Sequence, residues 1–136
     1  MSNAIKPEEL EKAIIEYLEN YVEDIEEDVE NTTNTVTKEA KQELIQTSPR
    51  SGIARDTKYY KGWAIKNGGR TRKGRYYSKV VWNKTNYQLT HLLEDGHHKR
   101  DGTGLVEAQP HIRKVQEKYG TKFADLLEKK IRRTSK

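Results

Sequence analysis

The chain has 136 residues, of which 32% are hydrophobic and 35% are charged, so it is long enough for one domain with a thin core. Cysteine is absent, which excludes a disulfide framework and a thiolate metal site. No apolar run approaches the roughly 20 residues that span a bilayer, and no secretory signal is visible. We therefore expect no membrane span and folding in the cytoplasm.

The net charge of +5 conceals a division between two parts of the chain. Residues 1–50 contain 5 Lys/Arg and 13 Asp/Glu, which gives −8, and residues 51–136 contain 21 Lys/Arg and 8 Asp/Glu, which gives +13. Such asymmetry suits binding to nucleic acid or to an acidic partner. It equally suits head-to-tail self-association, in which the acidic helix of one copy meets the basic part of the next. Charge alone leaves both interpretations open.

The N-terminal region, 1–48, is predicted to be helical. Pro7 suits a first helical turn, and apolar residues recur every three or four positions from Leu10 to Val29 and again from Val36 to Leu44. The segment 31–35, "NTTNT", is poor helix material. At about 1.5 Å per residue a continuous helix over residues 7–47 would run about 60 Å, whereas a compact domain of this size has a radius of gyration of about 14 Å. Two interpretations remain, namely two packed helices or one helix that bends or projects.

Residues 58–67 and 75–83 are rich in aromatic and β-branched residues and predict two antiparallel strands, with Trp63 and Trp82 facing the core. The glycine-bounded segment 68–74 between them predicts an extended hairpin loop. Basic residues gather at this loop, and they are Lys66, Arg70, Arg72, Lys73 and Arg75. Aromatic strands with a basic loop can bind nucleic acid, or the aromatics can simply form core beneath a solvated hairpin.

A short helix is predicted from Asn86 to Gly96, with Leu92 and Leu93 facing the core and Gly96 as the residue that ends it. The segment 97–104 is expected to be a loop and 105–110 a short extended segment. A last helix follows over 111–131, where apolar residues again recur at helical spacing.

Four histidines, His91, His97, His98 and His111, lie near acidic residues, as a metal or nuclease site would require. A zinc or nuclease centre needs three or four ligands that converge. His97 and His98 follow the predicted helix end, and adjacent residues there point in different directions. We expect no metal site, no cofactor and no enzymatic activity.

The segment order resembles the gene-product-ten-like family of long-tailed bacteriophages, whose members are minor tail components also called tail-completion or head–tail joining proteins. The likeness covers roughly residues 40–130 and is most specific in "YQLTHLLEDGH" and "QPHI". The stretch "GIARDTKYYKGW" is longer than the family's usual passage into the first strand. The residues that match the family's motifs are Pro49, Gly52, Trp63, Tyr87, His91, Leu92, Leu93, Glu94, Gly96, His97, Pro110 and His111.

This resemblance implies an α+β fold in a single domain, 1–136, with a long N-terminal helix. It further implies an antiparallel sheet with an extended hairpin, a short helix, and a C-terminal helix packed on the sheet. The sheet and these two helices would all lie in residues 49–136. It also implies a structural virion protein that forms a homo-oligomeric ring at the neck end of the tail. Partners would be tail-terminator or tail-tube proteins, head–connector proteins and, transiently, passing phage DNA, with no membrane contact.

Such a protein would be assembled in the host cytoplasm and located in the virion. Two alternatives come from the residues themselves. One is a small basic nucleic-acid-binding module that uses the hairpin loop, and the other is a metal-dependent nuclease that uses the histidines. Salt-dependent DNA binding by a monomer would favour the first, and bound metal with cleavage lost on changing His91 or His97 would favour the second.

Overall fold

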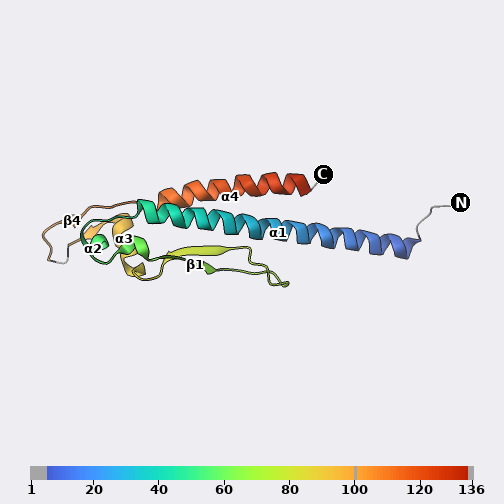
Figure 1. Ribbon diagram of the computed structural model, residues 1–136, viewed down its shortest axis with the longest axis horizontal. Coiled ribbons are helices and arrows are strands. Elements are labelled where there is room, and N and C mark those ends of the chain that lie inside the picture. The colour runs from blue at the N-terminus through green and yellow to red at the C-terminus, as the bar shows by residue number, and fades with distance from the viewer. Residues whose placement is uncertain (1–5, 100, 135–136) are drawn as a thin grey trace.

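A computed structural model describes residues 6–99 and 101–134, and Figure 1 shows their arrangement. The predicted α+β class, with a long N-terminal helix and antiparallel strands, is confirmed. In chain order the elements are α1 (Pro7–Thr47), α2 (Gly52–Asp56), η1 (Tyr59–Lys61), β1 (Trp63–Asn67), β2 (Lys79–Asn83), α3 (Tyr87–Asp95), β3 (His97–His98), β4 (Leu105–Val106) and α4 (Ile112–Thr134).

Helix α1 is continuous over 41 residues and does not break at 31–35. Threonine hydroxyls in this segment donate to the carbonyl oxygen four residues earlier: Thr32 to Asp28 at 2.7 Å and Thr35 to Asn31 at 3.0 Å. These bonds satisfy the hydroxyls inside the helix, and burial of Thr32 and Thr33 by the rest of the fold holds the segment helical. Of the two interpretations left open by the sequence, the single projecting helix is correct (Figure 1).

Strands β1 and β2 form the predicted antiparallel hairpin, with Trp63 opposite Asn83 and Ile65 opposite Val81. The hairpin continues past the strands, because the Gly68 N–H donates to the Ser78 carbonyl at 2.9 Å and the Tyr77 N–H to the Gly69 carbonyl at 3.0 Å. The first strand is shorter than predicted. Lys58 takes a left-handed conformation with φ of 52°, and residues 59–61 form a 3₁₀ turn before the chain extends.

The molecule is layered, with α4 on one side of α1 and the hairpin on the other (Figure 1). The prediction that the C-terminal helix packs on the sheet is corrected, because α4 runs along α1 and shares its main contacts with that helix. Only the beginning of α4 reaches the common core, where Val115 is buried and Ile112 and Tyr119 pack at its edge. Helix α1 therefore serves as the central layer.

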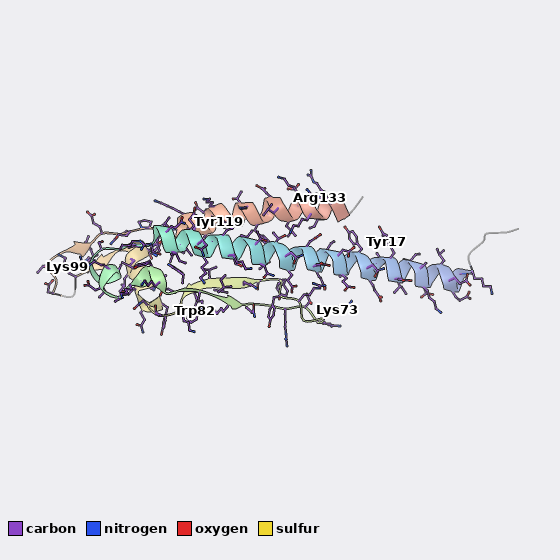
Figure 2. The ribbon with its side chains drawn as sticks, viewed as in Figure 1. Tyr17, Lys73, Trp82, Lys99, Tyr119 and Arg133 are labelled. Carbon is purple, nitrogen blue, oxygen red and sulfur yellow. The ribbon has the colours of Figure 1, made fainter. Side chains whose placement is uncertain are left out.

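The core lies near the C-terminal end of α1, and it consists of Ala40, Leu44, Ala54, Tyr59, Trp63, Leu93 and Val115. Two core predictions are wrong. Trp82 pairs with Ala64 on the hairpin face opposite to Trp63, and Figure 2 shows it on the side away from α1. Leu92 is 39% exposed while the adjacent Leu93 is 4% exposed. Strand β2 instead turns Val81 and Asn83 toward the core.

The segment predicted as a loop after Gly96 contains a second, smaller strand pair. His97 and His98 in β3 pair antiparallel with Val106 and Leu105 in β4. The alternation of the strand leaves His97 partly buried and His98 exposed. This pair carries the chain from the end of α3 to the start of α4.

Candidate functional site

Glu94 joins α3 to the beginning of α4. Its carboxylate oxygens accept three backbone N–H bonds from that beginning: His111 at 2.7 Å, Ile112 at 2.8 Å and Arg113 at 3.0 Å. The first N–H groups of a helix have no partner inside it, and a carboxylate there also complements the helix dipole. Glu94 therefore caps a helix that begins 17 or more residues later in the chain.

The environment of Glu94 sets its protonation. Burial acts to raise the pKa of the carboxyl group, but the three backbone N–H donors together with the neighbouring His111 ring outweigh burial and hold the pKa below its ordinary value. The side chain is 10% exposed. The carboxylate is thus kept ionised so that it can accept these bonds.

His111 is buried beneath the cap. Its Nδ1 lies 2.9 Å from the Gln109 carbonyl oxygen, and its Nε2 lies 2.9 Å from the Tyr59 hydroxyl. A carbonyl oxygen can only accept, so we assign the proton to Nδ1, which leaves Nε2 to accept from the Tyr59 hydroxyl. Burial raises the pKa of Tyr59, so its hydroxyl keeps the proton that it donates.

Tyr59, Trp63 and His111 form a cluster of three rings in edge-to-face contact. Their centroids are 5.6 Å apart for Tyr59–Trp63, 5.4 Å for Tyr59–His111 and 6.0 Å for Trp63–His111. The Trp63 indole N–H donates to the Ser48 hydroxyl at 2.6 Å, and Ser48 in turn donates to the Leu44 carbonyl at the end of α1. The cluster therefore links the ends of α1, β1 and α4 through satisfied polar groups.

Two further residues lock the chain around the cluster. Asn83 is 2% exposed; its amide donates to the Tyr59 carbonyl at 2.8 Å and its oxygen accepts the Asn86 N–H at 2.8 Å. Gly96 has φ of +75°, and a Cβ there would lie 2.7 Å from the Val106 carbonyl oxygen. Both the backbone conformation and the space at this turn require glycine.

Several motif residues taken from the sequence converge here, namely Trp63, Leu93, Glu94, Gly96 and His111. Others do not. Pro49 is buried where α1 ends, whereas Gly52, Tyr87, His91, Leu92 and Pro110 are exposed. Sequence reasoning gave no role to Tyr59 or Asn83. Tyr59 lies in the aromatic segment 58–67, which is predicted as a strand, so its sequence context does not distinguish it from its neighbours. No local sequence pattern marks Asn83 either.

The histidines do not come together. His91 and His98 are exposed on different elements, and His111 is held by its two hydrogen bonds. His97 has a buried Nδ1 without a hydrogen-bond partner in the described residues. Within residues 6–99 and 101–134, no three His, Cys, Asp or Glu side chains are grouped so that they could hold a metal ion.

The basic hairpin lies against the acidic helix of its own chain. Arg75 pairs with Glu30 at 3.3 Å, and the other oxygen of Glu30 accepts the Tyr76 N–H at 3.0 Å. Lys73 is 3.8 Å from Glu23. The remaining basic residues of the loop form no ion pair with α1 in the described residues. The Lys66 ammonium lies 4.5 Å from the Trp82 ring centroid, and Arg70 and Arg72 are exposed. Some of the acidic residues of α1 are thus paired with basic residues of the hairpin within one molecule.

In the part of the chain that the structure describes, neither the hairpin nor α4 forms an ion pair with α1 between Pro7 and Asn20. Every residue from Pro7 to Asn20 is exposed, including large apolar ones that lie between 48% and 67% exposed: Leu10, Ile14, Ile15, Tyr17 and Leu18. In Figure 2 Tyr17 lies beyond the end of α4 that carries Arg133. Exposed apolar groups gathered in this way mark an interaction surface.

These features define a structural subunit: the motif residues Trp63, Glu94 and His111 are engaged in hydrogen bonds inside the protein, and a projecting helix presents apolar side chains to the outside. The sequence model of the family described as "Bacteriophage HK97-gp10, putative tail-component" matches residues 12–96, more than half of the chain, and the chain belongs to this family. The resemblance seen in the sequence is thereby confirmed.

Comparison with curated proteins and with solved structures gave no match. Among the helices that the structure describes, none combines the length and the apolar character needed to cross a membrane.

Proposed function

We propose that this tail component is a tail-completion protein, which forms a homo-oligomeric ring at the neck end of the phage tail and helps to join the tail to the head. Its partners would be neighbouring copies, the tail-terminator or tail-tube proteins below and the head–connector proteins above. It acts in the virion after assembly in the host cytoplasm, without membrane contact or cofactor, and it catalyses no reaction.

The observation that supports this proposal most is the free N-terminal part of α1. A helix that exposes several large apolar residues along one side is unfavourable in a lone monomer, because about 25 cal/mol is lost for each Å² of apolar surface left in water. A ring subunit covers such a surface when it meets its neighbour. The rigid cluster around His111 keeps α1, the hairpin and α4 in fixed relation, as a subunit with defined neighbours requires.

The hairpin loop supports protein contact more than contact with DNA. A phosphate backbone would approach Lys73 and Arg75 where Glu23 and Glu30 already occupy them. The acidic helix beneath the loop also repels phosphate at the range of a Debye length, about 8 Å at physiological ionic strength. Passing DNA would therefore meet chiefly Arg70 and Arg72, as a transient contact.

Deletion of the coding sequence from the phage tests the proposal. We expect filled heads and separate tails in electron micrographs, loss of infectivity, and rescue by the protein supplied from a plasmid. Mass spectrometry of purified wild-type particles should detect the chain in multiple copies. Normal infectious particles from the deletion would contradict the proposed role.

A further inference from the structure

The exposed apolar residues of α1 lie on the side of the helix that is buried further along. Leu18, Val22, Ile25, Val29 and Thr32 follow one another at steps of three or four residues. At the same steps they lead to Val36, Ala40 and Leu44, which are buried. Positions three and four apart share one side of a helix. We call the exposed part, Leu10, Ile14, Ile15, Tyr17, Leu18 and Val22, the free stripe. It extends a packing surface to the tip of the hairpin, where Leu18 and Val22 line a groove with Arg72 and Lys73, and onward past that tip.

The charge around the free stripe selects its partner. Between residues 7 and 20 the sequence has five Asp/Glu and one Lys, which gives −4. Two such segments side by side would bring like charges together along their whole length, which is destabilising. The stripe therefore fits an apolar surface bordered by basic residues and does not fit a second copy of itself.

The outer face of the hairpin has this character. Ala64 pairs with Trp82 and Lys66 with Val80 on the face turned away from α1. Val80 is 43% exposed and Trp82 is half-buried, with the Lys66 ammonium resting on its ring at 4.5 Å. A two-stranded hairpin covered on one face only leaves such apolar residues open to a further layer.

The basic residues near this face are available for new ion pairs. Lys66, Arg70 and Lys84 have no carboxylate within salt-bridge distance in the part of the chain that the structure describes, Lys84 being exposed beside β2. Two lysines on α4 differ from these residues, because Lys118 pairs with Glu43 and Lys122 with Glu39. The side chains of α4 that lie against α1 at these positions are thus already neutralised, and charge complementarity favours the hairpin face over this part of the surface between α4 and α1.

We propose that the free stripe of one copy docks on the outer hairpin face of a second copy, with Leu18 and its apolar neighbours against Trp82 and Val80. The acidic residues beside the stripe then face Lys66 and Arg70. This inference rests on the proposed function, because it names the contact between adjacent subunits of the ring. The two surfaces are different patches, so the contact is heterologous and repeats around a closed ring or along a filament.

Engineered cysteines test the contact, because the chain has none of its own. Chains that carry Ile14→Cys, Leu18→Cys or Val22→Cys are each mixed with a Val80→Cys chain and treated with a short bismaleimide. We expect a cross-linked heterodimer with at least one stripe position, at a yield several-fold above that of Glu16→Cys with Val80→Cys. Glu16 is the matched control, since it is also exposed and lies two residues, about half a turn, from both Ile14 and Leu18.

Equal yields with Glu16→Cys and with the stripe positions would overturn the docking model. So would Leu18→Cys alone cross-linking as readily as the mixture, because the stripes would then pair with each other. Full-length Leu18→Cys/Val80→Cys chains should give a ladder of multimers in assembled particles.

The result in particles separates the two proposals. Particles that need the protein but give no cross-link at any stripe position would refute the docking and leave the tail-completion role standing. Particles that form normally without the protein would refute that role, while the cross-link between purified chains would still support the docking.

Discussion

Replacing Glu94 by alanine should destabilise the protein strongly, although this residue is neither apolar nor part of an exposed ion pair. Three backbone N–H groups at the start of α4 lose their acceptor in this variant. Loss of a helix cap alone costs about 0.5–2 kcal/mol, and each bond to a charged group contributes about 1.5–3 kcal/mol. Water can replace part of the loss, because Arg113 is exposed. We expect a decrease of about 2–4 kcal/mol in the free energy of unfolding.

Urea unfolding followed by tryptophan fluorescence measures this decrease, since Trp63 lies in the cluster beneath the cap. Asp95→Ala is the matched control: the neighbouring carboxylate is 61% exposed and lies 3.7 Å from Arg113, so its loss should cost below about 1 kcal/mol. Glu94→Gln keeps one acceptor oxygen, so its loss of unfolding free energy should lie between those of Glu94→Ala and Asp95→Ala. Equal stability of Glu94→Ala and Asp95→Ala would refute the capping role.

Because Glu94 caps α4 as a carboxylate, the stability of the protein should depend on pH. The pKa of Glu94 is lower in the folded protein than its ordinary value of 4.5, so its contribution to stability is complete above that value and is lost as the pH falls through the folded pKa. The difference in unfolding free energy between the wild type and Glu94→Gln should therefore be constant near neutral pH and shrink below about 4.5. A difference that stays unchanged down to the acid transition would contradict this sign.

Three further variants, two of them with a matched control variant, test the fold by the same urea assay. Leu93→Ala should cost about 2–5 kcal/mol as a buried truncation, whereas Leu92→Ala should cost below about 1 kcal/mol, and equal effects would show that the orientation of α3 is wrong. Gly96→Ala should cost about 1–3 kcal/mol because of its positive φ and its contact with the next segment, and a neutral result would remove that constraint. Glu30→Lys should destabilise the hairpin by about 1–2 kcal/mol through two lost bonds, while the exposed Glu27→Lys should stay within about 0.5 kcal/mol.

The helices and the hairpin could be predicted because their apolar periodicity is local. The orientation of β2 could not. Val80, Val81 and Trp82 are consecutive apolar residues, so alternation does not say which of them faces the core. The register is instead fixed by Asn83, a polar residue that is stable inside because its amide bonds to the chain at Tyr59 and Asn86.

The cap at α4 was beyond sequence reasoning for a different reason. Local signals for a helix start lie at or next to its first residue, whereas Glu94 comes from the preceding helix and reaches α4 only after the chain has folded back. The motif match with the family singled out Glu94 and His111 separately, but it could not show that one accepts the backbone N–H of the other. The continuity of α1 was likewise undecided, because the poor helix propensity of this segment is offset by tertiary packing, which buries Thr32 and Thr33.

The bonds that join α3 to α4 also close a loop. The Gln109 N–H donates to the Leu93 carbonyl at 2.6 Å, one residue before Glu94 binds the start of α4. The segment between Glu94 and Gln109 therefore begins and ends at neighbouring positions, which these bonds hold together. The position of α4 is set by the bonds and does not depend on the length of this segment. Doubling such a loop costs only about 0.6 kcal/mol of closure entropy. The exposed turn between Asp101 and Gly104 can therefore accept a peptide tag, which gives a handle for locating the subunit in assembled tails.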